Sequence, residues 1–279
     1  MLPFWLSIAV LSLVQGATVL GPSRRVVVDL RRLRSPWWAL IPPLSVLAFV
    51  LVGRLAEHAS GQALTYLALV AVPLLAALAL GWCAWSTHGP YPPAALLVAP
   101  LFALAWIDRG GLVGQAAAVI LAALSCVTLG VLLGAVTPAR WLAVGIVLMA
   151  LADTAVVVSD LLQRPNDVLN AAQPAANLPR LQSASFGDAV MGYGDLFVAG
   201  LLGGLLAGSR NRARQLQGAA LVAVLALGLD LLFFLVDELP ATVPVALATI
   251  AVGLHRARGA AEQRRAASPR APGTSTMLR

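Results

Sequence analysis

The segment 186–207, FGDAVMGYGDLFVAGLLGGLLA, decides the class of this protein. It is long enough to cross a bilayer, because about 20 apolar residues in a helix span the hydrocarbon core. It also contains Asp195, and a charged side chain at the centre of a membrane helix costs about 2.5–3.5 kcal/mol on insertion scales. An acid at such a position is by default a functional hypothesis. The segment therefore predicts a membrane helix and a functional site within it.

The composition of the whole chain agrees with a membrane protein. Of its 279 residues, 59% are hydrophobic and only 11% are charged, whereas a soluble domain carries about 25% charged residues. So few charges cannot cover a globule in water, which excludes the soluble class. All 19 basic residues are arginines, and they cluster between apolar runs, as in segments that orient membrane proteins. This pattern accounts for the net charge of +7, so nucleic acid is not an expected partner.

Nine apolar runs of about 15–25 residues predict an all-α fold with nine membrane helices. The runs are 2–20, 37–56, 63–85, 93–107, 112–136, 139–162, 186–207, 216–236 and 240–255. The first has no basic residue before it, so we expect a retained helix and not a cleaved signal peptide. The segment 163–185 is predicted to be a long loop. The expected parts are an N-terminal five-helix bundle (1–136), a catalytic four-helix part (137–255) and a basic disordered tail (256–279).

Three acids lie well inside the apolar runs: Asp153, Asp195 and Asp230. At a rise of about 1.5 Å per residue, Asp153 is about 13 Å from the end of its run and Asp195 about 13 Å from the start of the next. These two runs are joined on one side of the membrane, so the two carboxylates would meet at one depth. Asp160 would lie about 10 Å shallower. The spacing therefore favours Asp153 and Asp195 as a pair.

Glycines surround the second acid of this pair. Gly192 and Gly194 flank Tyr193 directly before Asp195. They weaken the helix and remove side-chain bulk, so that another backbone can approach the carboxylate. Further along the same run, small residues repeat every four positions, at Gly200, Gly204 and Gly208. This spacing predicts a face for close packing against another helix.

A third motif, Pro240-Ala241-Thr242, opens the last apolar run, and Pro244 follows it. Two prolines four residues apart delay the start of a helix and leave backbone groups unpaired near membrane depth. Such backbone is tolerated only where it is buried in protein or lines a wet cavity. The motif therefore predicts an irregular segment close to the functional site.

Together, these motifs resemble those of the GxGD intramembrane aspartyl proteases, the presenilin and signal peptide peptidase family. That family has a catalytic aspartate in the sixth of nine spans, GxGD in the seventh and Pro-Ala-Leu at the start of the ninth. Asp153, the 192–195 motif and the 240–242 motif stand at these places, and the resemblance covers residues 139–254. The first five spans match in number only. Two positions depart from the pattern: Ala152 replaces a tyrosine and Thr242 replaces a leucine.

The resemblance implies an endopeptidase that hydrolyses peptide bonds inside transmembrane helices. Two close carboxylates cannot both ionise cheaply, so Asp153 and Asp195 would share a proton. The ionised one would activate a water and the protonated one would donate to the carbonyl oxygen. The residues expected to bind or position the substrate are Gly192, Tyr193, Gly194, Pro240, Ala241 and Thr242. The two departures are expected to affect substrate positioning more than chemistry, so Thr242→Leu should keep or raise activity.

The expected partners are the lipid bilayer and transmembrane helical peptides. This chemistry requires no metal or cofactor, and none is expected. The three histidines are scattered, at His58, His88 and His255. The physiological substrate, the oligomeric state and any accessory subunit stay open at this point.

Three alternative functions remain open from the sequence. A type IV prepilin peptidase also uses GxGD, but it usually carries a cytosolic cysteine tetrad and lacks the proline motif. An ion or proton transporter would use Asp153, Asp195 and Asp230 as a relay through the bundle, and broken helices suit transporters too. A catalytically inactive relative would bind transmembrane helices without cutting them, which agrees with the changes at Ala152 and Thr242.

The arginines predict the orientation of the chain. If the amino terminus is outside, 15 of the 19 arginines fall in inner segments. The other four are Arg54, Arg109, Arg164 and Arg180. The positive-inside rule therefore places the amino terminus outside and the carboxyl terminus in the cytoplasm. Arginine without any lysine suggests a GC-rich genome and a prokaryotic plasma membrane. By analogy with signal peptide peptidase, the substrates would be type II anchors or signal-peptide remnants.

Overall fold

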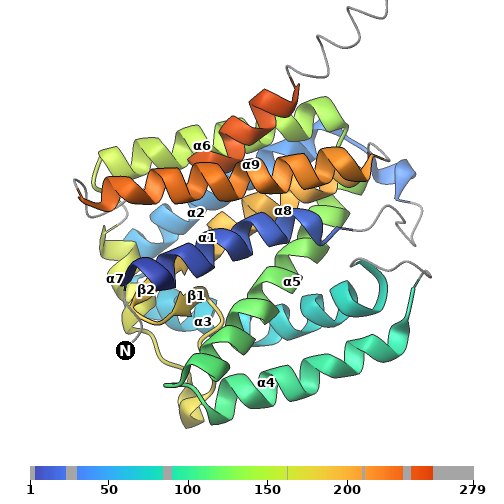
Figure 1. Cartoon of the computed structure of the whole chain (residues 1–279). Coiled ribbons are helices and arrows are strands. Elements are labelled where there is room, and N and C mark those ends of the chain that lie inside the picture. Colours follow the sequence, from blue (N-terminus) through green and yellow to red (C-terminus); the bar gives the residue numbers. More distant parts are fainter. Residues whose placement is uncertain are drawn as a thin grey trace, which may run out of the picture.

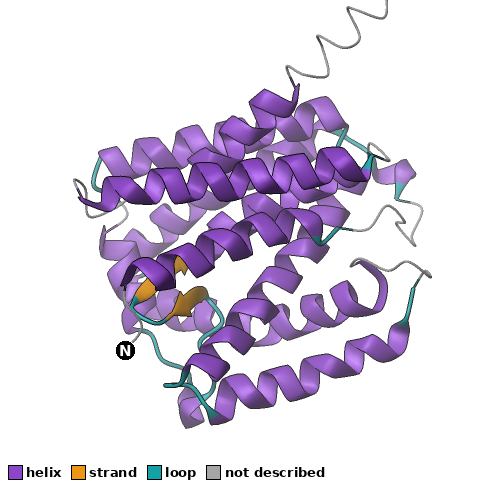
Figure 2. Ribbon diagram, viewed as in Figure 1, coloured by secondary structure: helices purple, strands orange, loops and turns teal. Residues whose placement is uncertain are grey.

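The computed structural model describes residues 4–22, 30–83, 90–161, 163–208, 211–234 and 240–253. Within them the chain is a bundle of helices with one small β-hairpin (Figures 1 and 2). The elements are α1 (Phe4–Leu20), α2 (Ile41–Leu55), α3 (Glu57–Leu78), α4 (Val98–Ile107), α5 (Leu112–Val136), α6 (Ala139–Val158), α7 (Gln163–Ala171), β1 (Ser183–Phe186), β2 (Ala189–Gly192), α8 (Tyr193–Ala207) and α9 (Arg212–Asp230). A last helix covers Val243–Gly253. The predicted tail at 256–279 lies outside the described residues.

Four of the described helices are long and apolar enough to cross a membrane. They are Pro36–Leu55, Ser60–Cys83, Leu112–Val136 and Ala139–Val158. Four shorter apolar helices accompany them: Phe4–Leu20, Pro92–Ile107, Tyr193–Ala207 and Val243–Gly253. Large apolar side chains face outward from the bundle; Ile107 and Val158, for example, are 82% and 81% exposed. The described chain is thus mostly helical with four candidate membrane-spanning helices, as expected of an all-α membrane protein.

The predicted start of the seventh helix at Phe186 is wrong. Strands β1 and β2 pair antiparallel there, and Figure 2 shows this hairpin at the end of the bundle where α1 begins. Gly187 has a φ of 57°, which glycine adopts without steric cost, and with Asp188 it forms the two-residue turn. The helix therefore begins only at Tyr193.

The segment 163–185, predicted as a loop, also contains regular structure. Helix α7 lies there and packs on α2 and α3. A Cβ added at Gly53 would contact Pro165, and one added at Gly61 would contact the carbonyl oxygen of Val168. The two glycines therefore let α7 sit directly on the backbones of α2 and α3, which ties the segment between α6 and α8 to the bundle.

Helices α5 and α8 pack closely along the predicted glycine face. A Cβ added at Gly204 would overlap the carbonyl oxygen of Gly130, and one at Gly200 would overlap that of Cys126. The small-residue face is therefore confirmed at Gly200 and Gly204. At Gly208 an added Cβ would meet no atom of the described residues closer than 3.6 Å, so this glycine is not needed for the contact.

Helix α1 lies against α8 and α9 in the middle of the bundle (Figure 1). One hydrophobic core joins it to the later helices, with buried residues from both of the predicted parts of the chain. Among them are Leu11, Val19, Cys126, Ile146, Met149, Leu196, Leu201, Val222 and Val245. The first helix therefore forms part of the surroundings of the candidate site.

Candidate active site

Asp153 is held near the end of α6 by a residue of the proline motif. Its Oδ2 accepts a hydrogen bond of 2.7 Å from Oγ1 of Thr242. Thr242 is 2% exposed and lies in the turn before the helix Val243–Gly253. The hydroxyl of Thr242, at the position where the resembled motif has leucine, thus contacts the first candidate aspartate directly.

Asp195 lies in the first turn of α8, because that helix starts later than predicted. The estimate that it is about 13 Å from the helix start is therefore wrong. Its Oδ2 accepts a hydrogen bond of 3.1 Å from the backbone N–H of Gly192, the N-cap residue. A carboxylate at the third helical position commonly satisfies the N-cap amide in this way. The bond holds the carboxyl group of Asp195 beside the end of strand β2.

The structure brings the two predicted acids together. Helices α6 and α8 are in contact, and the carboxyl groups of Asp153 and Asp195 are near enough for their charges to interact directly. Both side chains are half-buried. Asp160, in contrast, is exposed in the turn after α6. The predicted choice of Asp153 over Asp160 as the neighbour of Asp195 is confirmed.

The remaining residues of the GxGD motif have separate surroundings. The hydroxyl of Tyr193 lies 2.7 Å from Oγ of Ser125 on α5. Ser125 donates its own proton to the carbonyl oxygen of Ala122 at 2.6 Å, so Tyr193 is the donor in this contact. A Cβ added at Gly194 would meet only Met149 of the described residues, at an ordinary 3.6 Å. Apart from this side chain of α6 and the chain around Gly194 itself, no described residue lies within 4 Å of that Cβ position.

The proline motif forms a turn and not a helix. The backbone N–H of Val243 donates to the carbonyl oxygen of Pro240 at 3.1 Å. Helical bonding begins only with the N–H of Ala246, which donates to Thr242 at 3.1 Å. The predicted delay of the helix start is confirmed, and Ala241 and Thr242 lie beside the two acids.

Sequence reasoning missed one polar residue of this region, Gln15 on α1. It is 0% exposed, and its Nε2 donates to the carbonyl oxygens of Ala241, at 2.8 Å, and Asp195, at 3.3 Å. The signal was present in the sequence, because Gln15 is the one amide side chain in the apolar run 2–20. A buried amide in an apolar helix requires partners.

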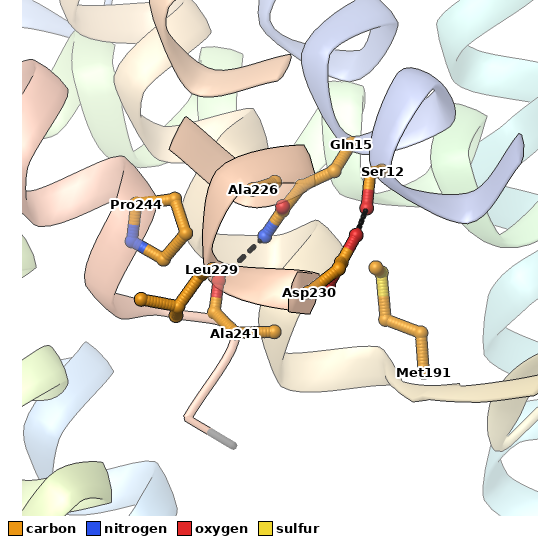
Figure 3. Close-up of a pocket in the computed structure, with 8 residues that line it drawn as sticks. All are labelled: Ser12, Gln15, Met191, Ala226, Leu229, Asp230, Ala241 and Pro244. Atoms are coloured by element: carbon orange, nitrogen blue, oxygen red, sulfur yellow. Dashed lines mark hydrogen bonds between the residues drawn. The ribbon is translucent and has the colours of Figure 1, made fainter. Parts of the chain in front are cut away.

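Asp230, the third acid predicted inside an apolar run, lies at the end of α9 and contacts α1. Its Oδ2 accepts a hydrogen bond of 2.5 Å from Ser12. Next to this pair is a cavity of about 20 Å³, which has room for one water molecule. Its lining, drawn in Figure 3, comprises Ser12, Gln15, Met191, Ala226, Leu229, Asp230, Ala241 and Pro244.

Comparison with protein-family profiles, curated proteins and solved structures finds no match for this chain. Among the residues that the structure describes, no group of three or more His, Cys, Asp or Glu side chains is placed to hold a metal ion. The functional interpretation therefore depends on Asp153, Asp195 and the residues that contact them.

Proposed function

We propose that this protein is an intramembrane aspartyl endopeptidase that uses Asp153 and Asp195 to hydrolyse peptide bonds within transmembrane helices. The observation that carries the proposal is the approach of these two acids, from α6 and α8, inside an apolar bundle. The turn at 240–242 supports it further, since Thr242 bonds to the first acid. A pair of carboxylates with separate hydrogen-bond donors is suited to sharing one proton.

The reaction follows from that shared proton. The ionised carboxylate removes a proton from a water molecule, whose oxygen attacks the carbonyl carbon of the substrate. The protonated carboxyl group gives its proton to the carbonyl oxygen, and a tetrahedral diol forms. When the diol collapses, one of its hydroxyl groups gives its proton to the ionised carboxylate, the C–N bond breaks, and the leaving nitrogen takes up the proton of the other carboxyl group. The two aspartates finish with one proton between them, as they began.

The substrate must be extended before it can react, because the carbonyl groups of a helix are bonded to amides four residues on. Backbone that can pair with an extended peptide lies on both sides of Asp195. Strand β2 leads directly into α8, and its residues Val190 and Gly192 are exposed. In the turn at 240–242 the three carbonyl oxygens already accept hydrogen bonds, so the backbone that this turn can offer a substrate is limited to its N–H groups. We propose that the substrate adds to one of these edges as a strand.

We propose nine membrane spans for the whole chain. Four of them are the helices that are long and apolar enough to cross a membrane, and five are shorter or less apolar helices. Each of the nine apolar runs contains a described helix. With nine spans, the excess of arginine in alternate segments leads us to propose that the amino terminus lies outside and the carboxyl terminus in the cytoplasm. The proposed substrates are then helices whose amino ends face the cytoplasm, such as type II anchors or signal-peptide remnants.

The test is a cleavage assay with purified protein in liposomes. The substrate is a labelled peptide with one apolar helix of about 20 residues, incubated with and without an aspartyl transition-state analogue. We expect cleavage within the apolar segment and its loss in the presence of the analogue. The proposal would be contradicted if folded protein left the substrate intact, or if the analogue did not inhibit cleavage.

A further inference from the structure

Gln15 joins α1 to the helix turn that contains Asp195 and to the 240–242 turn, whose Thr242 bonds to Asp153. Figure 3 shows its amide directed at the carbonyl oxygen of Ala241, and the same Nε2 also reaches the carbonyl oxygen of Asp195. Both partners are carbonyl oxygens, which can only accept hydrogen bonds, so the amide nitrogen must be the atom that faces them. One side chain thus connects three segments that are far apart in sequence.

The connection bears on the distance between the two acids. Ala241 is followed by Thr242, whose hydroxyl bonds to Asp153. The amide of Gln15 therefore fixes the turn that holds Asp153 relative to the helix turn that carries Asp195. The amide oxygen of Gln15 is buried and has no protein partner among the described residues. All hydrogen bonds that the Gln15 amide makes to described residues are therefore donated by its nitrogen.

We propose that Gln15 is a positioning residue that sets the geometry of the aspartate pair, a role that rests on the proposed protease function. Without its amide, the turn at 240–242 would lose its bond to α1 and shift relative to α8. A catalytic pair is sensitive to such shifts, since a displacement of about 1 Å can reduce a rate about 100-fold.

A matched control exists in the same bundle. Gln215 on α9 is also buried, at 2% exposure, and its Nε2 donates to the carbonyl oxygens of Val19, at 2.9 Å, and Pro22, at 3.1 Å. It is therefore a buried glutamine that bonds to two carbonyl groups, as Gln15 does, but those groups lie in and just after the last turn of α1, at the opposite end from Phe4. Gln215→Leu removes the same two kinds of hydrogen bond, and in addition the bond that Arg212 donates to the Gln215 amide oxygen at 2.7 Å, without touching the residues around the aspartates.

The first experiment compares Gln15→Leu with Gln215→Leu in the cleavage assay, with active sites counted by titration with a tight-binding aspartyl inhibitor. We expect kcat per titrated site to fall at least about tenfold in Gln15→Leu and to stay within about twofold in Gln215→Leu. A purely structural role would lower the number of active sites and leave kcat per site unchanged. Equal kcat values in the two variants would overturn the proposal.

A second experiment needs no cleavage. In a chain with Cys83→Ala and Cys126→Ala, Val243→Cys places a thiol directly after the 240–242 turn, and its rate of alkylation by N-ethylmaleimide reports whether the turn is held. We expect Gln15→Leu to raise this rate several-fold and Gln215→Leu to leave it unchanged. Equal rates would overturn the proposal. If the wild-type chain cleaves nothing, the protease function fails, and the alkylation rates alone decide whether Gln15 holds the turn.

Discussion

Replacing Thr242 by valine tests how closely the proline motif is coupled to the chemistry. Valine has nearly the shape of threonine but cannot donate a hydrogen bond. Thr242 is 2% exposed, and its Oγ1 lies 2.7 Å from Oδ2 of Asp153. The substitution therefore preserves the packing and removes one donor from a half-buried carboxyl group.

The size of the effect follows from the type of bond. A hydrogen bond to a charged group contributes about 1.5–3 kcal/mol, and about 1.36 kcal/mol corresponds to a tenfold change in rate. We therefore expect Thr242→Val to lower kcat by about 10- to 150-fold. Thr242→Ser keeps the hydroxyl, so its kcat should stay within about threefold of the wild type. The hydrogen bond also leads us to expect that Thr242→Leu loses activity, the opposite of the expectation from the family pattern.

The assay is cleavage of the helical reporter in liposomes, with kcat expressed per inhibitor-titrated site. The serine variant controls for loss of the methyl group, and a thermal unfolding curve for each variant controls for loss of structure. If Thr242→Val cleaved as fast as Thr242→Ser, the hydroxyl would have no part in the chemistry. The coupling between the proline turn and Asp153 would then be refuted.

Three further predictions concern the turn, the helix packing and the orientation. Pro240→Ala should let the last helix start earlier, so that backbone we assign to the substrate pairs within the helix. Cleavage should then fall at least about tenfold while the unfolding temperature is unchanged. Full activity would show that the motif serves only to start the helix. Gly204→Val should lower the unfolding temperature by several degrees in detergent, because its side chain would overlap the backbone of α5. Gly208→Ala, whose added Cβ would meet described atoms only at ordinary contact distances of 3.6 and 3.9 Å, should not. Equal unfolding temperatures would contradict the packing. A reporter fused after Arg279 should lie in the cytoplasm and one before Met1 outside; the reverse would contradict both the topology and the polarity of the substrates.

The apolar helices of this protein could be predicted because apolar runs alone define them in a membrane, whereas the polar helix α7 gave no such signal. The hairpin could not be predicted by the same criterion, since Phe186 and Val190 are as apolar as the residues of a helix. A local signal was present: Gly187-Asp188 between two short segments is a typical two-residue hairpin turn. The prediction counted apolar residues and gave this turn no weight, which placed the start of the helix before Tyr193.

The pair of acids could be predicted, but the contacts that orient it could not. Asp153 and Asp195 followed from their positions in adjacent runs. The bond from Thr242 depends on how the 240–242 turn packs on α6, 89 residues away, and the bridge by Gln15 depends on how α1 meets that turn, 226 residues away. In one sequence nothing relates segments so far apart. Thr242 in particular was interpreted as a departure from a family pattern, although in the structure its hydroxyl donates a hydrogen bond to Asp153.

The most direct test of the proposed chemistry is mass spectrometry of the reporter after incubation with four forms of the protein: wild type, Asp153→Asn, Asp195→Asn and Asp160→Asn. Each variant replaces one carboxylate by an amide of the same shape, and Asp160 is the exposed acid next along the chain from Asp153. We predict two fragments, cut within the apolar segment, from the wild type and from Asp160→Asn, and intact reporter from the other two. Fragments of the same mass from Asp153→Asn or Asp195→Asn would show that these two acids are not the catalytic pair.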